Sequence, residues 1–231
     1  MAGAVVKAGC LPATAFGHAS MVKVKICGIT NWTDARRAAE AGADFLGFNF
    51  YLRSPRHITP GAALKIARRL PRHISIVGVF VNEREAKIVQ IARAVGLDFI
   101  QLHGDESPAA IARLRRVAPV IRAVRVRRAI RTAQLRVFRA ASAILLDGFD
   151  GQQYGGTGKK FSWALLRHAK IKKRIFLAGG LNPENIAGAI RASRPYAVDV
   201  CSGVEARPGK KNAALLKALM LAVRTTKRKS R

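Results

Sequence analysis

The sequence is poor in acidic residues, aromatic residues and cysteine. Its 231 residues include 42 lysines and arginines but only 13 aspartates and glutamates, which leaves a formal net charge of +29. Such a field attracts polyanions at low salt. Aromatic residues, however, make up only 6% of the chain, so few side chains can stack on single-stranded bases, and no zinc-finger spacing or RNA-recognition signature is present. We expect at most non-specific contact with nucleic acid.

The scarcity of cysteine and of long apolar runs excludes further classes of protein. Cys10, Cys27 and Cys201 are too few for a disulfide framework, which fits a reducing cytoplasm. No run of about 18 apolar residues occurs, so we expect no contact with a membrane. Residues 1–21 lack a clear signal-peptide pattern. We expect them to be a disordered extension, or sequence upstream of a true start at Met21, and we expect the basic residues 224–231 to form a solvated tail.

Eight short apolar runs alternate with longer segments of helical period. The ends of successive runs lie about 20 to 30 residues apart, which is typical of repeated strand–helix units. The predicted strands are Val22 to Cys27, Asp44 to Phe50, Ser75 to Val81, Asp98 to His103, Val120 to Val126, Ala143 to Asp147, Arg174 to Ala178, and Tyr196 to Ser202. The pattern predicts a single α/β domain over residues 22–223, a (βα)8 TIM barrel of eight parallel strands with outer helices.

Helix boundaries agree with this repeat. Polar caps stand where helices should begin, at Thr30 or Asn31, Thr59, Ser107 and Asn182. Gly42 and Gly96 stand where helices should stop. An open doubly wound sheet is the alternative fold, but it would leave some of the units unexplained, and no Gly-x-Gly-x-x-Gly follows the first strand.

Cys27 is the first candidate catalytic residue, because the active site of such a barrel lies at the carboxyl ends of its strands. Alternation places Val24 and Ile26 on one face of the first strand and Lys25 and Cys27 on the other. If the apolar pair faces the helices, Lys25 lies inside the barrel and lowers the pKa of the neighbouring thiol. The alternative is a small buried hydrophobic Cys27; its position beside Gly28 at a strand tip favours a reactive thiol.

Asp147 is the second candidate. It ends an apolar strand, where an unpaired carboxyl group would resist ionisation and could remain protonated as a general acid near neutrality. The alternative is a carboxylate that caps the following loop. A thiolate and a carboxylic acid from different strands make an acid–base pair, which suits an isomerisation that needs no cofactor and no metal.

Glycine-bearing loops follow the last two strands, at Gly179-Gly180 and at Ser202-Gly203. Barrels commonly bind phosphate at these positions through backbone N–H groups, although either loop alone could be a tight turn. A third glycine cluster, with Gly155 and Gly156, follows the strand that carries Asp147. It does not match a Walker loop, and we expect a flap over the substrate.

Seven segments resemble phosphoribosylanthranilate isomerase, the barrel enzyme family of the tryptophan pathway, in order along residues 22–223. They are Lys25 to Thr30, Gly47 to Phe50 with Ser54 and Arg56, Gly78 to Asn82, Gln101 to Gly104, Leu146-Asp147, Gly155 to Lys159, and Asp199 to Glu205. One departure is Cys201, where the family often has another small residue. Because the eighth strand must neighbour the first in a closed barrel, we expect the sulfur of Cys201 near Cys27.

The resemblance implies an Amadori rearrangement of N-(5-phosphoribosyl)anthranilate. It makes Asp147 the general acid that protonates the ribose ring oxygen and Cys27 the base that removes the C2 proton. By the same resemblance Arg56 holds the anthranilate carboxylate, and His103 and Asp199 line the sugar site. The substrate is then a small phosphorylated molecule, and the chain is a monomer or a homodimer.

Two other functions stay open. The first is the isomerase of the histidine pathway, which has similar chemistry. That enzyme resembles a site built on two aspartates, whereas this chain has Cys27 on the first strand. A nucleic-acid-binding protein built on a barrel is the alternative of another class, and it would account for the charge of +29.

Overall fold

The computed structural model describes residues 22–126, 135–148 and 173–226. The expected extension over residues 1–21 and the expected flap residues Gly155 and Gly156 lie outside these ranges. Among the described residues, no helix is long and apolar enough to cross a membrane. The last helix, α7, covers Ala213–Thr225, so it continues past the boundary expected at residue 223.

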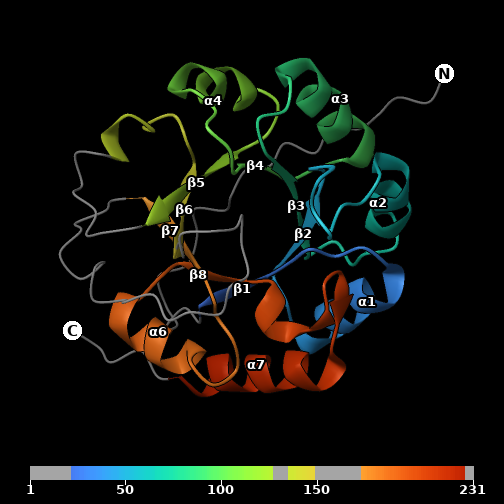
Figure 1. Ribbon diagram of the computed structural model, residues 1–231, viewed down its shortest axis with the longest axis vertical. Coiled ribbons are helices and arrows are strands. Elements are labelled where there is room, and N and C mark those ends of the chain that lie inside the picture. Colours follow the sequence, from blue (N-terminus) through green and yellow to red (C-terminus); the bar gives the residue numbers. More distant parts are fainter. Residues whose placement is uncertain (1–21, 127–134, 149–172, 227–231) are drawn as a thin grey trace.

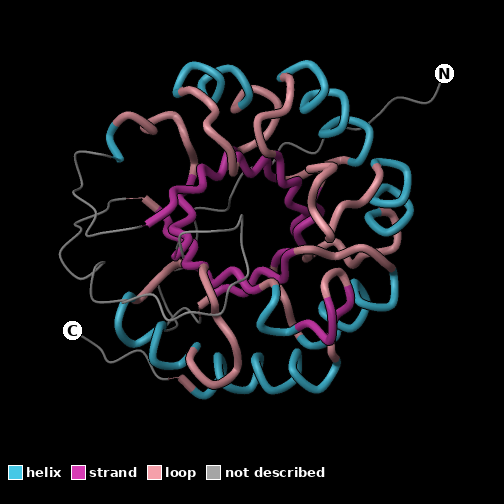
Figure 2. The backbone as a smooth tube through the Cα atoms, viewed as in Figure 1, coloured by secondary structure: helices cyan, strands magenta, loops and turns pink. Residues whose placement is uncertain are grey.

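Eight parallel strands close into a barrel in their order along the chain, and Figure 2 shows them as a ring. They are β1 (Lys23–Cys27), β2 (Phe45–Asn49), β3 (Ser75–Phe80), β4 (Phe99–Leu102), β5 (Val120–Val126), β6 (Ala143–Gly148), β7 (Arg174–Ala178) and β8 (Ala197–Val200). Strand β1 pairs with both β2 and β8, which completes the ring. The predicted fold is confirmed.

The eighth strand ends earlier than predicted. Strand β8 stops at Val200, because Cys201 leaves the extended conformation with φ −123° and ψ −86°. Ser202 therefore begins a short 3-10 helix, η2 (Ser202–Val204), instead of ending the strand. An antiparallel hairpin follows, formed by β9 (Glu205–Arg207) and β10 (Lys210–Lys211).

Helices surround the ring of strands on the outside (Figure 1). Those in the described residues, besides α7, are α1 (Trp32–Ala41), α2 (Pro60–Ala67), α3 (Glu85–Val95), α4 (Pro108–Leu114) and α6 (Ile186–Ser193). Three predicted caps are confirmed: side-chain oxygens of Asn31, Thr59 and Ser107 accept hydrogen bonds from backbone N–H groups of the first turn. At Asn182 the side chain instead caps a turn, and α6 begins after it.

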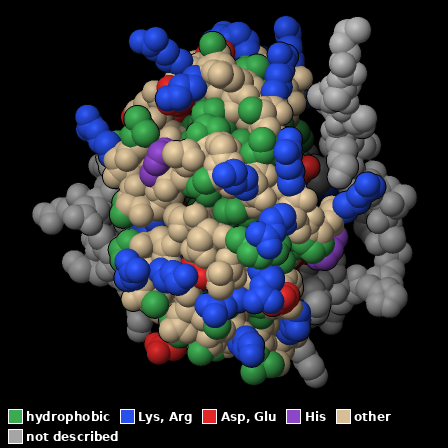
Figure 3. Space-filling view, turned by 90° about the vertical axis from the view of Figure 1, so that its right-hand side faces the viewer, with side chains coloured by type: hydrophobic (Ala, Val, Ile, Leu, Met, Phe, Trp, Pro, Cys, Tyr) green, Lys and Arg blue, Asp and Glu red, His purple; other side chains and the backbone are tan. Residues whose placement is uncertain are grey.

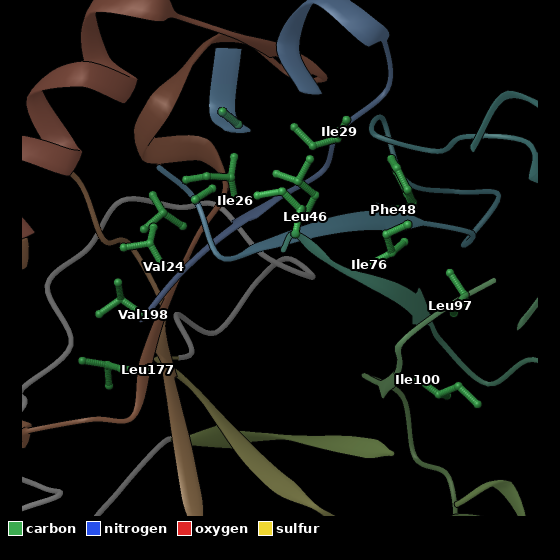
Figure 4. Packing of buried hydrophobic residues seen from close by; sticks show 14 of the residues in the cluster. Val24, Ile26, Ile29, Leu46, Phe48, Ile76, Leu97, Ile100, Leu177 and Val198 are labelled. Carbon is green, nitrogen blue, oxygen red and sulfur yellow. The ribbon is translucent and has the colours of Figure 1, made fainter. Parts of the chain in front are cut away.

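The core has an outer layer between strands and helices and an inner layer inside the barrel. Successive residues of β1 alternate between these two layers. Val24 and Ile26 belong to the outer layer between strands and helices, where Ile26 lies beside Leu46 of β2 (Figure 4). Inside the barrel, the ring of Phe45 packs edge-on against Phe99 and Phe176 at centroid distances of 5.8 and 5.3 Å. Each buried phenylalanine contributes about 1.5–3 kcal/mol of burial free energy.

Lys25 and Cys27 point into the barrel, as predicted. Lys25 is fully buried and lies in register with Asp199 of β8. Polar side chains thus replace the apolar inner layer toward the carboxyl ends of the strands. Because burying such groups without partners is costly, their arrangement indicates where the chemistry takes place.

On one face of the molecule, the positive charge of the described residues is spread out. Figure 3 shows lysines and arginines distributed over the face in view, with only a few acidic side chains between them. This face carries no compact basic patch of the kind that tracks a nucleic-acid backbone.

Candidate active site

Cys27 lies at the end of β1, in register with Gly47 of β2. A Cβ atom at residue 47 would come within 2.8 Å of Cys27 Sγ, so glycine at this position leaves room for the sulfur. A hydrogen bond from Cys201 lowers the pKa of the Cys27 thiol well below its ordinary value, and the charges of Lys25 and Lys211 assist against the cost of burial. The site therefore favours the thiolate form of Cys27.

Cys201 supplies that hydrogen bond from the neighbouring end of β8. The contact with Cys27, together with burial, raises the pKa of the Cys201 thiol, so Cys201 stays protonated as the donor. The expectation that the two sulfur atoms lie close together is confirmed.

Mild oxidation is expected to inactivate the protein through this pair. Peroxide converts the Cys27 thiolate to a sulfenic acid, and the adjacent Cys201 thiol condenses with it to a disulfide with loss of water. We expect dithiothreitol to restore the activity of the peroxide-treated parent, whereas Cys201→Ser cannot form the disulfide and passes from the sulfenic acid to a sulfinic acid that dithiothreitol does not reduce. Equal recovery of the two proteins would count against a role for the second thiol.

Lys25 and Asp199 form a buried ion pair beneath the thiolate. Lys25 Nζ lies 2.9 Å from both carboxylate oxygens of Asp199. Burial disfavours the ammonium form, but the charges of Asp199 and Cys27 outweigh it and raise the pKa of Lys25. Burial raises the pKa of Asp199 to about 6, against the charge of Lys25. Asp199 thus faces Lys25, and its predicted contact with the sugar stays a prediction.

Asp147 lies beside His103, with His103 Nε2 at 3.2 Å from Asp147 Oδ2. The expectation of an unpaired carboxyl in an apolar setting is therefore wrong, because β4 places a histidine next to it. Nε2 of Gln101 lies 3.0 Å from His103 Nδ1. In this arrangement the amide donates to Nδ1, which leaves the ring hydrogen on Nε2, toward Asp147. The two side chains are thus in hydrogen-bond contact at the mouth of the barrel.

Arg56 follows β2 and reaches the end of β1. Its aliphatic chain packs over Gly28, where a Cβ atom would lie 2.7 Å from Arg56 Cδ. The guanidinium group pairs with Glu205 of β9, with Nη2 at 2.7 Å from Oε2. This hydrogen bond raises the pKa of Arg56, so its positive charge is constant next to Cys27.

The two predicted phosphate loops touch each other. Gly179 and Gly180 have φ of +94° and +64°, a conformation that favours glycine. A Cβ at residue 203 would collide with the backbone oxygen of Leu181, so only glycine allows this approach. Ser202 and Gly203 are the first two residues of η2, and Gly203 makes this contact with Leu181. Phosphate binding by these residues stays a prediction.

Sequence reasoning missed the partners of the candidate residues. Gln101 and Glu205 lie in segments that carry the family resemblance, but no function was predicted for either. Lys211 was one of many basic residues in a basic chain. The structure gives each of them a partly buried polar contact with a candidate residue or its neighbour. The available signal for Glu205 was the scarcity of acidic residues. In a chain with so many lysines and arginines, each carboxylate is expected to form an ion pair.

The barrel and the groups at its mouth define a class: a (βα)8 barrel that gathers ionisable side chains at the carboxyl ends of its strands, where enzymes of this fold have their active sites. Comparisons with known proteins agree. A family model described as N-(5'phosphoribosyl)anthranilate (PRA) isomerase matches residues 24–222. The N-(5'-phosphoribosyl)anthranilate isomerase of Pelobacter propionicus is 49% identical over 210 residues, which cover 91% of this chain and 99% of the relative.

Solved structures give the same result. Phosphoribosyl anthranilate isomerase from Thermotoga maritima matches with a TM-score of 0.82 and 44% identity, covering 88% of this chain and 99% of that one. A complex of such an isomerase with reduced 1-(o-carboxyphenylamino)-1-deoxyribulose 5-phosphate matches at 0.77 and 41% identity, covering 88% and 99%. The chain belongs to the N-(5'-phosphoribosyl)anthranilate isomerase family, enzymes of tryptophan biosynthesis.

Proposed function

We propose that this protein rearranges N-(5-phosphoribosyl)anthranilate to 1-(2-carboxyphenylamino)-1-deoxyribulose 5-phosphate, with Asp147 as general acid and Cys27 as general base. One observation carries the assignment of roles: Cys201 and Lys25 lower the pKa of Cys27, while Asp147 Oδ2 lies 3.2 Å from His103 Nε2 on another strand. A base and an acid on separate strands allow the two proton transfers to occur at different atoms of one substrate.

The reaction needs both groups in turn. Asp147 protonates the ribose ring oxygen, and the C1–O bond breaks to give a Schiff base between C1 and the anthranilate nitrogen. The Cys27 thiolate then removes the C2 proton, and the electron pair moves toward C1 and neutralises the iminium nitrogen. The resulting enolamine takes up a proton at C1 as its C2 hydroxyl becomes the ketone.

Binding follows the same assignment of residues. Arg56 holds the anthranilate carboxylate, since a guanidinium group matches a carboxylate with two hydrogen bonds. His103 and Asp199 line the sugar, and backbone N–H groups near Gly180 and Gly203 hold the phosphate. The related isomerase bound to a carboxyphenylamino sugar phosphate supports this division, because its ligand carries all three groups.

The alternatives are weaker. The histidine-pathway reaction would call for a second aspartate where this chain has Cys27. A nucleic-acid ligand would need a concentrated basic surface, and the charge is dispersed on the face seen in Figure 3. The cytoplasmic location and the choice between monomer and homodimer stay predictions.

The pH dependence of turnover tests this proposal. We expect kcat/KM for N-(5-phosphoribosyl)anthranilate to have an acidic limb set by Cys27, because the thiolate is present above the lowered pKa of Cys27 and is lost as the pH falls through it. In Cys201→Ala the pKa of Cys27 rises, so the acidic limb moves to higher pH. Cys201→Ser keeps a donor and is the matched control.

Two outcomes would contradict the proposed function or the role of Cys27. Absence of turnover by the parent at any pH would remove the proposed function and favour a binding protein. Identical acidic limbs in the parent, Cys201→Ala and Cys201→Ser would show that Cys27 is not the titrating base.

A further inference from the structure

Arg56 uses only one edge of its guanidinium group to bind Glu205. Nε lies 3.0 and 3.1 Å from the two carboxylate oxygens, and Nη2 lies 2.7 Å from Oε2. The other edge consists of Nη1 and the second N–H of Nη2. In the described part of the chain, no side chain pairs with this edge. A planar guanidinium can bind two carboxylates at once, one on each edge.

Glu205 is itself held from three sides. Besides Arg56, Lys211 Nζ lies 2.9 Å and the backbone nitrogen of Gly209 lies 3.2 Å from Oε1. The Glu205 side chain is 4% exposed and that of Lys211 is fully buried. Burial opposes ionisation of Glu205, but the hydrogen bond from Arg56 and the charge of Lys211 outweigh it, so the pKa of Glu205 is lowered.

The hairpin that carries Glu205 and Lys211 is anchored to the base of the reaction. Lys211 Nζ also donates to the backbone oxygen of Cys201 at 3.1 Å, and the backbone nitrogen of Lys211 donates to Asp34 of α1 at 2.8 Å. Thr30 Oγ1 donates to the backbone oxygen of Gly209 at 2.6 Å. The position of Glu205 is therefore fixed relative to the ends of β1 and β8.

We propose that Glu205, held by Lys211, is a positioning residue that orients Arg56 so that its free edge faces the substrate carboxylate, and thereby sets selectivity for a carboxylated aromatic ring. The inference rests on the proposed function and deepens it. An arginine has many rotamers, and holding it in one of them before binding removes an ordering cost from association. Gly28 completes the arrangement, because its missing side chain lets the Arg56 chain lie against β1 beside Cys27.

The test compares two substrates in two variants. The substrates are N-(5-phosphoribosyl)anthranilate and N-(5-phosphoribosyl)aniline, which lacks only the carboxylate. In Glu205→Gln we expect KM for the carboxylated substrate to rise about tenfold to a hundredfold with little change in kcat, while kcat/KM for the aniline substrate stays near that of the parent. A merely structural role would lower the activity on both substrates together.

The control is Glu85→Gln. Glu85 binds Arg113 through the same two atoms, Nε and Nη2, at 2.8 and 2.6 Å, on the exposed surface between α3 and α4. Loss of this pair should change neither substrate. If Glu205→Gln does not fold, Glu205→Asp keeps the charge beside Lys211 but shortens the reach to Arg56, and it should show the same selective loss.

Each outcome decides one question. A Glu205 variant that keeps the parent's preference for the carboxylated substrate, or that loses activity on both substrates equally, would overturn the positioning role. A parent that converts both substrates equally well would also overturn it while leaving the isomerase function intact. A parent that converts neither would remove the proposed function itself.

Discussion

Replacing Cys27 with alanine is expected to lower kcat by about a thousandfold or more, which lies within the range for loss of a positioned general base. Alanine cannot accept the C2 proton from the substrate. Cys27→Ser should lose nearly as much activity, because a hydroxyl group is a far weaker base than a thiolate at neutral pH.

Binding and folding serve as the controls for Cys27→Ala. Reduced 1-(o-carboxyphenylamino)-1-deoxyribulose 5-phosphate should still raise the thermal unfolding temperature of the variant, because ligand binding to the folded state stabilises it. Turnover within about tenfold of the parent would contradict the assignment of Cys27 as the base.

Replacing Asp147 with asparagine should have an effect of similar size. The amide has the shape of the carboxyl group and can still contact His103, but it cannot deliver a proton to the ring oxygen. We expect kcat to fall by about a hundredfold to ten-thousandfold, with little change in affinity for the reduced product. Steady-state kinetics and a binding titration of the same preparation measure the two quantities separately.

Asp105→Asn is the matched control for Asp147→Asn. Asp105 is exposed in the loop that follows β4, so its replacement makes the same chemical change without touching the acid–base pair. Unchanged turnover in Asp147→Asn, or an equal loss in Asp105→Asn, would contradict the role of Asp147 as general acid.

The fold was predictable from local features of the sequence. Eight apolar runs at regular spacing gave the strands, and polar residues such as Asn31 and Ser107 gave the helix starts. Closure of the barrel also predicts that Cys201 lies near Cys27, because β8 must pair with β1. These inferences succeeded because each depends on alternation, helical period or topology.

The partners of the candidate site residues were not predictable in the same way. Arg56 and Glu205 are separated by 149 positions in the chain, and their pairing depends on a hairpin that begins only because Cys201 turns the chain out of β8. His103 meets Asp147 across the mouth of the barrel; no sequence pattern predicts that contact. In a chain with 42 basic residues, basic side chains by themselves do not reveal which of them are buried and paired.

The measurement that tests the central claim most directly follows deuterium placed at C2 of the ribose ring of N-(5-phosphoribosyl)anthranilate. If Cys27 removes this atom as a proton, the label should leave for solvent as product forms, and Cys27→Ala should release almost none. Full retention of the deuterium at C1 of the product made by the parent would contradict the account, because it would mean that hydrogen moves directly between the two carbons without a base.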